Sequence, residues 1–130
     1  MQSAVIGRGS RTLTFARDEE RDENLVAILA DGGLRAELPI EAGYIGYAGL
    51  GTFFAELESG WRGWKGAIVF ESLEHDLLLR ATHRGHVMID VRLRELTPDG
   101  WTANSTISVD PGEELSRIAS AVAHVISHGA

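Results

Sequence analysis

The chain has 130 residues and no cysteine, which predicts one domain over residues 1–130 that folds without disulfide or thiolate-metal support. Its net charge of −7 argues against nucleic acid as a partner and favours a basic partner, although solubility alone also explains an acidic surface. It lacks a signal-peptide pattern and any apolar run of about eighteen residues, so we expect a cytoplasmic protein that does not span a membrane.

The first third of the chain predicts short strands over residues 4–8, 11–17, 24–30 and 34–40. Asp31-Gly32-Gly33 predicts a hairpin turn, because glycine reaches positive φ without steric cost. Pro39 cannot donate to a sheet, so its strand ends there or lies at an edge. Residues 18–23 hold five acids and one base, which predicts an exposed loop.

Two helices are predicted from apolar residues at helical spacing. The first has the stripe Leu50, Phe53, Phe54 and Leu57, and the last has Leu115, Ile118, Ala119, Val122 and Ile126. We expect Gly60 to end the first helix in the left-handed conformation. Asp110 caps the last helix, Pro111 takes its first position and Glu113 completes a capping box.

Between the helices, strict alternation of apolar and polar residues predicts two hairpins. Three-residue loops at His83-Arg84-Gly85 and Pro98-Asp99-Gly100 fit a type I turn followed by a left-handed glycine. These loops predict the apolar pairs Ala81 with Val87, Leu79 with Ile89, Leu77 with Val91, Val91 with Ile107, and Ile89 with Val109. They also place Asp76 opposite Arg92 as a charge pair.

The predicted fold is α+β, with one curved antiparallel sheet of about seven to eight strands and both helices packed on one face. The predicted core is Leu50, Phe54, Leu57, Ile89, Val91, Ile107, Leu115, Ile118 and Val122. The other face of the hairpins is expected to present Leu78, Arg80, Thr82, His86, Met88, Asp90, Arg92, Arg94, Asn104, Thr106 and Ser108. Its arginine, methionine and hydroxyl groups are typical of a protein-interaction surface, and an ordinary solvated face explains them equally well.

No motif predicts catalysis, a cofactor or a metal site. His124 and His128 are four residues apart and His83 and His86 flank a turn, but no carboxylate completes a ligand spacing with either pair. The glycines at 43, 46, 49 and 51 resemble a phosphate-binding loop only loosely. Trp61, Trp64 and Trp101 are expected to anchor the core, and an exposed indole among them becomes a candidate binding hot spot.

Five short motifs carry a family resemblance over most of residues 45–125. They are Trp61-Arg62-Gly63-Trp64 with Gly66, Leu73-Glu74, Gly85-His86-Val87, Trp101, and Gly112-Glu113-Glu114-Leu115. In these motifs the chain resembles an actinobacterial family of domains of unknown function (number 6228). That family is similar in layout to immunity proteins of the cell-wall-associated toxin type, which implies a cytoplasmic protein that binds and blocks a toxin. No catalytic residues are assigned in the family, so none are carried over.

Two functions remain open. The first is a non-enzymatic protein-binding domain, such as an immunity-like protein that neutralises a basic toxin domain. The second is a small ligand-binding domain or enzyme with a pocket between sheet and helices, using His86, Asp90 and Arg92. For the first we expect the partner to dock on Asp18, Glu19, Glu20, Asp22, Glu23, Arg80, Met88 and Arg92. The sequence leaves the oligomeric state open.

Overall fold

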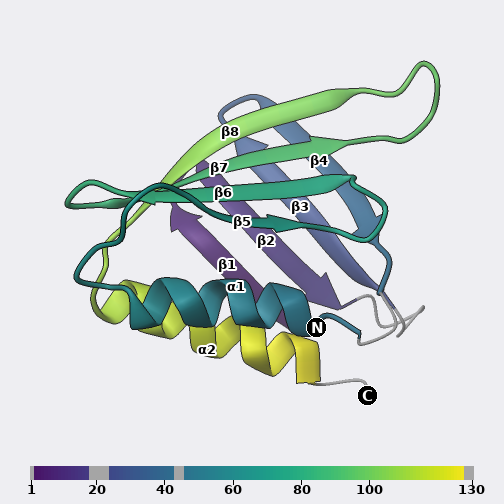
Figure 1. The fold of residues 1–130 in the computed structure, drawn as a ribbon. Helices are drawn as coiled ribbons and strands as arrows, with labels where there is room; N and C mark the ends of the chain where they lie inside the picture. Colours follow the sequence, from purple (N-terminus) through teal and green to yellow (C-terminus); the bar gives the residue numbers. More distant parts are fainter. Residues whose placement is uncertain (1, 18–23, 43–45, 128–130) are drawn as a thin grey trace.

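The computed structural model describes residues 2–17, 24–42 and 46–127 (Figure 1). Over these residues a helix follows each of two groups of four strands. The elements are β1 (Ser3–Arg8), β2 (Arg11–Arg17), β3 (Leu25–Asp31), β4 (Leu34–Ile40), α1 (Ala48–Ser59), β5 (Ile68–Glu71), β6 (Leu77–His83), β7 (Val87–Arg94), β8 (Thr102–Val109) and α2 (Glu113–Ser127). Neither described helix has the length and apolar character needed to cross a membrane.

The first four strands form an antiparallel sheet in which each strand pairs with its neighbours in the chain. At the turn between β3 and β4, Asp31 pairs with Leu34 and Gly32 has φ +59°, which confirms the predicted hairpin. Pro39 lies in β4, and β4 is an edge strand, as the missing N–H group of proline requires.

The last four strands form a second antiparallel sheet, again in chain order. The loop between β6 and β7 is Arg84-Gly85-His86 rather than His83-Arg84-Gly85, so the pairing differs from the prediction by two residues. The predicted pair of Asp76 and Arg92 is therefore wrong, and Arg92 lies opposite Leu78. A displacement of two residues keeps every side chain on its face, so the predicted buried set is retained. The observed apolar pairs are Leu77 with Leu93, Leu79 with Val91, and Ala81 with Ile89.

The register between β7 and β8 also differs from the prediction by two residues, so that Ile89 pairs with Ile107. The left-handed glycine predicted for both loops is confirmed at Gly85, where φ is +89°, and is wrong at Gly100. A Cβ atom at Gly100 would lie 2.1 Å from the carbonyl oxygen of Glu95. This loop therefore needs glycine for a close backbone approach and not for its φ angle.

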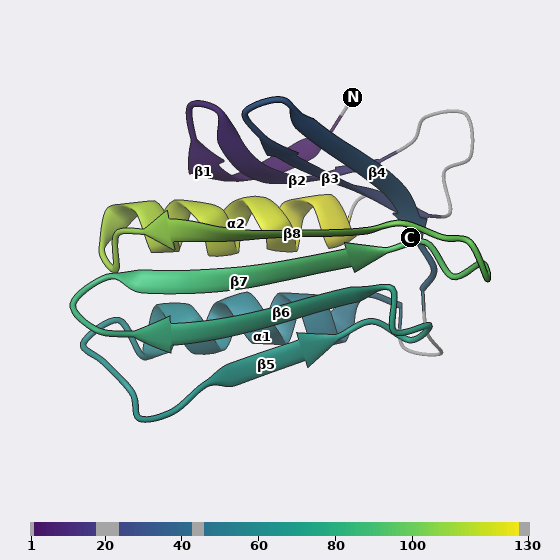
Figure 2. The same cartoon turned by 90° about the horizontal axis from the view of Figure 1, so that it is seen from above.

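The single curved sheet of seven to eight strands predicted from the sequence is wrong, because the strands form two separate sheets of four. α1 separates β4 from β5 in the chain, so no hairpin joins the sheets. β1 and β8 pack against each other without pairing. Gly7 of β1 has φ +97°, and a Cβ atom there would lie 2.9 Å from Cγ2 of Ile107, so glycine permits this approach. Figures 1 and 2 show the first sheet inclined to the second.

The helices pack against each other, with α1 also on β5 and α2 on β1 and β2. Figure 2 shows the second sheet lying over both helices. Buried side chains from both sheets and both helices form one hydrophobic cluster. All nine predicted core residues are buried, which confirms Leu50, Phe54, Leu57, Ile89, Val91, Ile107, Leu115, Ile118 and Val122. Near the end of α2, Val125 is fully buried and Ile126 only partly, so the predicted stripe is displaced by one residue there.

The helix ends differ from the predicted caps. Gly60 follows α1 with φ −91°, so the predicted left-handed cap is wrong. Before α2, the backbone N–H of Asp110 donates to Glu114 Oε1 at 2.9 Å. Glu114, and not Glu113, is therefore the carboxylate that reaches back to the segment before the helix. The predicted first helical position at Pro111 is wrong, because Pro111 and Gly112 form a turn and α2 begins at Glu113.

Candidate functional site

The outer face of the second sheet consists of the side chains that alternate with the core residues of its strands. On β6, β7 and β8 this outer face contains Leu78, Arg80, Thr82, Met88, Asp90, Arg92, Arg94, Asn104, Thr106 and Ser108. All of them are exposed or half-buried, as the alternation predicts. The face thus brings together Arg80, Met88 and Arg92, the three strand residues predicted to bind a partner.

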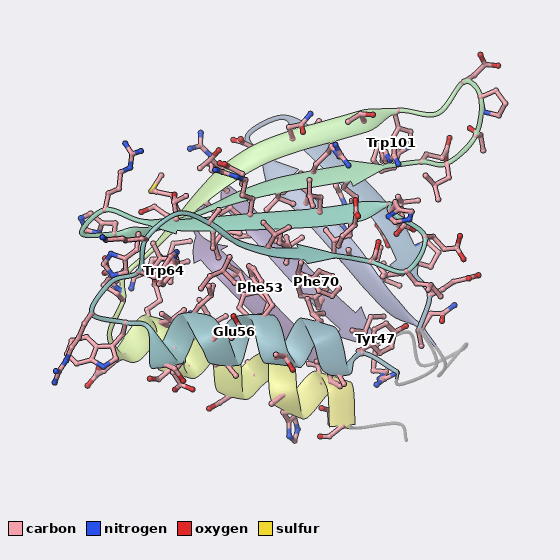
Figure 3. The ribbon with its side chains drawn as sticks, in the orientation of Figure 1. Tyr47, Phe53, Glu56, Trp64, Phe70 and Trp101 are labelled. Carbon is pink, nitrogen blue, oxygen red and sulfur yellow. The ribbon has the colours of Figure 1, made fainter. Side chains whose placement is uncertain are left out.

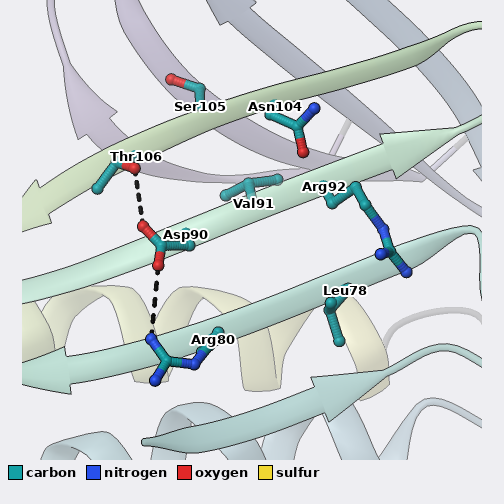
Figure 4. Close-up of a pocket in the computed structure, with 8 residues that line it drawn as sticks. All are labelled: Leu78, Arg80, Asp90, Val91, Arg92, Asn104, Ser105 and Thr106. Atoms are coloured by element: carbon teal, nitrogen blue, oxygen red, sulfur yellow. Dashed lines mark hydrogen bonds and ion pairs between the residues drawn. The ribbon is translucent and has the colours of Figure 1, made fainter.

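An open hollow of about 490 Å³ lies in the outer face (Figure 4). The strand register arranges its polar lining in two rows. One row runs across the strands through Arg80, Asp90 and Thr106, and the other through Leu78, Arg92 and Asn104. Val91 and Ser105 lie between the rows, and their side chains alternate to the inner side, so they contribute backbone to the floor.

The first row is held together by Asp90. Thr106 Oγ1 donates to Asp90 Oδ1 at 2.7 Å, and Arg80 Nη1 lies 3.8 Å from Asp90 Oδ2 (Figure 4). The second distance is too long for a hydrogen bond, and both charged side chains are half exposed to solvent. This ion pair therefore contributes little to stability and leaves the guanidinium donors of Arg80 available to another acceptor.

The second row has a less satisfied cation. Arg92 Nη2 lies 4.0 Å from Glu71 Oε2, and the other oxygen of Glu71 lies 2.9 Å from His75 Nδ1. Arg92 Nε is buried and has no hydrogen-bond partner among the described residues. A buried donor left without an acceptor costs about 1–3 kcal/mol. The hollow thus contains an arginine whose hydrogen-bonding capacity the described part of the chain does not use.

The alternative function, a small ligand-binding domain or enzyme, requires polar side chains that line a pocket between the second sheet and the helices. Phe53 of α1 and Phe70 of β5 lie in that space, with ring centroids 6.4 Å apart (Figure 3). Asp90 and Arg92 line the hollow on the opposite side of the sheet. His86 lies apart from them, with Nδ1 3.3 Å from Asp110 Oδ1.

The predicted acidic docking residues, Asp18, Glu19, Glu20, Asp22 and Glu23, lie outside the described residues. The residues on either side of them have defined contacts. Arg17 is buried and donates from Nη2 to the carbonyl oxygen of Ile126, at the C-terminal end of α2, at 2.8 Å. Leu25 donates its N–H to the Tyr47 hydroxyl at 2.8 Å, and burial raises the pKa of Tyr47. β2 and β3 are therefore anchored by these contacts at Arg17 and Leu25.

The histidines do not come together as a site in the described part of the chain. His83 Nε2 lies 2.8 Å from the carbonyl oxygen of Trp61, whereas His86 contacts Asp110, so the two do not face each other across their turn. His124 is exposed near the end of α2, and His128 lies outside the described residues. Over residues 2–17, 24–42 and 46–127, no group of three or more His, Asp or Glu side chains could hold a metal ion.

The tryptophans divide by exposure. Trp64 and Trp101 pack partly buried against the core, and Trp64 Nε1 donates to the carbonyl oxygen of Ala81 at 3.3 Å (Figure 3). Trp61 is 50% exposed, with the guanidinium carbon of Arg62 5.0 Å from its ring centroid. The prediction that Trp61 anchors the core is therefore wrong, and Trp61 is the exposed indole that becomes a candidate binding hot spot.

A second hollow, of about 320 Å³, lies where β1, β2, β8 and the start of α2 meet. Its charged groups are paired: Arg8 Nε lies 2.5 Å from Glu114 Oε2, and Arg11 Nε lies 3.1 Å from Asp31 Oδ2. These pairs link the first sheet to α2 and join neighbouring strands within it. The second hollow is therefore a structural junction.

The glycines that loosely resemble a phosphate-binding loop are not arranged as one. Gly49 and Gly51 lie within α1, and Gly46 precedes it, while Gly43 lies outside the described residues. The described glycines therefore do not form a loop between a strand and a helix N-terminus.

Sequence reasoning missed two features of the hollow. It did not place Glu71 beside Arg92, because the displaced register opposed Arg92 to Asp76. It also did not pair Arg80 with Asp90, although their opposite charges at facing positions were a usable signal for the true register.

The chain belongs to DUF6228, a family of unknown function, whose model matches residues 5–129. The match includes the N-terminal strands as well as the segment that carries the motifs described above. Comparisons with curated proteins and with solved structures find no match. The actinobacterial origin and the likeness to immunity proteins stay predictions.

Proposed function

We propose that this DUF6228 domain is a non-enzymatic protein-binding module that docks its partner on the outer face of β5–β8. The observation that carries the proposal is the pair of incompletely used arginines, Arg80 and Arg92, beside the open hollow. Both present guanidinium donors from a rigid sheet, with Leu78 and Met88 as apolar neighbours. Arginine and methionine are enriched at protein interfaces, and lysine is depleted.

The partner we propose is a basic protein such as a toxin domain, which this domain would neutralise in the cytoplasm in the manner of an immunity protein. The net charge of −7 supports this choice, since it attracts a basic protein at long range. The outer face is itself mixed in charge, with Arg80 and Arg92 beside Asp90 and Glu71. Long-range attraction and short-range contact therefore use different parts of the chain.

A binding experiment with the basic proteins encoded beside this gene tests the proposal. We expect one of them to bind in isothermal titration calorimetry and to arrest growth unless this chain is co-expressed. The double variant Arg80→Glu with Arg92→Glu should weaken binding at least tenfold. Arg35→Glu is the control for each single charge reversal, because Arg35 is an exposed arginine on β4 with a similarly loose pair to Glu37, at 3.5 Å. Failure of every neighbouring protein to bind overturns the proposal, and equal binding by the double variant overturns the docking face.

A ligand-binding or enzymatic role for the same hollow is the second candidate. The volume of about 490 Å³ supports it, because small-molecule pockets occupy about 300–1,000 Å³. In that case Arg80, Arg92 and Asp90 would contact a small polar ligand directly. Saturable binding of a metabolite in the absence of any protein partner, together with loss of that binding in Arg92→Gln, would favour this second candidate over the first.

A further inference from the structure

The two sheets have four edge strands, and three of them are covered or protected. β1 and β8 are the edges that pack against each other, with Gly7 set closely against Ile107. β4 is interrupted by Pro39 and carries the charged pair Arg35 and Glu37. Proline and charged side chains on an edge are the usual means by which sheets avoid pairing with other chains.

β5 has none of these protections. Its sequence, Ile68-Val69-Phe70-Glu71, has no proline and no lysine, and its single charge lies at the end. Among the described residues it pairs only with β6, and Figure 2 shows it as the outermost strand of the second sheet. Val69 is 55% exposed, and Leu73, just beyond the strand, is 56% exposed. An unprotected, apolar edge strand is a template for pairing with another strand.

We propose that β5 pairs antiparallel with β5 of a second copy of this chain, about a two-fold axis at Val69. A two-fold interface brings the same patch of each copy together, so the patch must complement itself. With Val69 on the axis, Val69 faces its own copy on the outer side, and Ile68 faces Phe70 of the second copy on the inner side. Every facing pair within the strand is then apolar, apart from Glu71, which faces Ala67.

The charges flanking β5 support the antiparallel arrangement. Lys65 precedes β5, Glu71 is its last residue and Glu74 follows it, and all three are exposed. Antiparallel pairing brings Lys65 of each copy diagonally close to Glu71 of the other, within reach of long side chains. A register moved by two residues, with Phe70 on the axis, would instead place Glu71 opposite Val69. A register centred on Ile68 would place Glu71 directly opposite Lys65, but it would pair Val69 with Ala67 and Phe70 with Gly66. The match of large apolar side chains therefore selects the register centred at Val69, in which Lys65 and Glu71 keep their diagonal contact.

The proposed interface is small, so the dimer should be weak. A strand of four residues buries less than the roughly 800 Å² per partner that specific complexes need. We expect a dissociation constant on the order of 100 μM, so the dimer forms at high concentration or where a partner holds two copies together. Pairing would join two copies of the second sheet edge to edge and place their hollows on one extended face.

Sedimentation equilibrium on the purified full chain tests self-association. The average mass should rise from that of the monomer toward twice that value as concentration increases from about 10 μM to 1 mM. Val69→Lys places two lysines opposite each other and should remove the rise, while Leu34→Lys, at the 40% exposed start of β4, should leave it unchanged. A mass that stays monomeric overturns the proposal, as does a rise that Val69→Lys leaves intact. A strand from a different protein as the true occupant of this edge would give the monomeric result.

A cross-linking experiment checks the register even if Val69→Lys perturbs folding. Because the chain has no cysteine, Val69→Cys creates a single thiol. Facing residues in an antiparallel pair lie about 4.5–5.5 Å apart at Cα, within the range that a disulfide bridges. Mild oxidation should convert Val69→Cys to a covalent dimer at least tenfold faster than the matched edge variant Leu34→Cys. Equal rates for the two variants contradict the proposed axis.

Discussion

Ser105 of β8 donates a hydrogen bond from its hydroxyl to Asp31 Oδ2, at the end of β3, at 2.8 Å. This contact joins the two sheets through polar side chains. It also lowers the pKa of Asp31, with Arg11 acting in the same direction and partial desolvation opposing both. The junction of the sheets is therefore sensitive to acid at one identified carboxylate.

Replacing Ser105 by Ala should raise the pKa of Asp31 toward its ordinary value of 3.8. Since the pKa is lowered in the folded state, the stability it supplies is present above pH 3.8 and is lost as pH falls through the folded-state pKa. Ser105→Ala should therefore lose less stability in that acid range than the natural chain. Carboxyl NMR titration measures the pKa directly, and Ser108→Ala, on the outer face of the same strand, should leave it unchanged. A pKa that does not move would show that the hydrogen bond is not its main cause.

Gly7→Ala should destabilise the fold more than Gly9→Ala. Both glycines have positive φ, at +97° and +63°, which costs an L-residue about 1–2 kcal/mol. At Gly7 the added methyl group would also lie 2.5 Å from the carbonyl oxygen of Arg11 and 2.9 Å from Ile107, whereas Gly9 faces open space. Overpacking adds about 1–3 kcal/mol. Urea unfolding of both variants measures the difference in the free energy of unfolding. Equal losses of stability would mean that the contact between β1 and β8 accommodates the added methyl group at little cost.

Glu114→Ala should cost about 1 kcal/mol of stability, because it removes the acceptor for the Asp110 N–H group and for Arg8. Glu113→Ala is the matched control, since it removes the same charge from the same helix turn but is exposed. Thermal unfolding should therefore separate the two variants. Equal stabilities would restore Glu113 as the capping residue expected from the sequence.

Ile89→Ala should cost about 2–5 kcal/mol, because Ile89 is fully buried among the side chains of β6, β7 and β8. Leu96→Ala removes a similar side chain that is 50% exposed, so its cost should stay within about 0.5 kcal/mol. Denaturant midpoints of the two variants provide the comparison. A small loss of stability in Ile89→Ala would contradict the assignment of Ile89 to the buried face of β7.

Neutralising Asp18, Glu19, Glu20, Asp22 and Glu23 together should slow association with a basic partner several-fold at low salt and leave dissociation nearly unchanged. Stopped-flow mixing at two salt concentrations measures the effect. The control neutralises the same number of exposed acids elsewhere: Glu37, Glu41, Glu56, Glu74 and Asp99. If the scattered set slows association as much as the loop set, the attraction comes from net charge and the loop has no special role.

The strands were predictable because each depends on local alternation, but their registers were not. A displacement of two residues leaves apolar residues facing apolar residues, so Ala81 satisfies burial opposite either Val87 or Ile89. Each register also makes one charge pair, Asp76 with Arg92 or Arg80 with Asp90. The conformation of the loop around Gly85 decides between them, and that conformation depends on contacts that a linear pattern does not encode.

The separation of the strands into two sheets could not be predicted from the sequence pattern, for a related reason. Hairpin signals specify which strands pair inside each half, but they say nothing about the meeting of β1 and β8. That meeting depends on a single missing side chain at Gly7 and on polar contacts such as Ser105 with Asp31. The outer face was predictable from alternation alone, whereas the unmet donor of Arg92 depends on how neighbouring side chains fill space.

The order of the strands has a consequence for how the chain reaches this structure. Every strand pair in both sheets joins strands that follow each other in the chain, so each sheet can form from short loops with a small closure entropy. Contacts that span the chain, such as Arg8 with Glu114 over 106 residues, arise only when the preformed halves meet. We therefore expect the docking of two hairpin arrays to be the slow step in folding, with the exposed edges of each array at risk of aggregation until that step is complete.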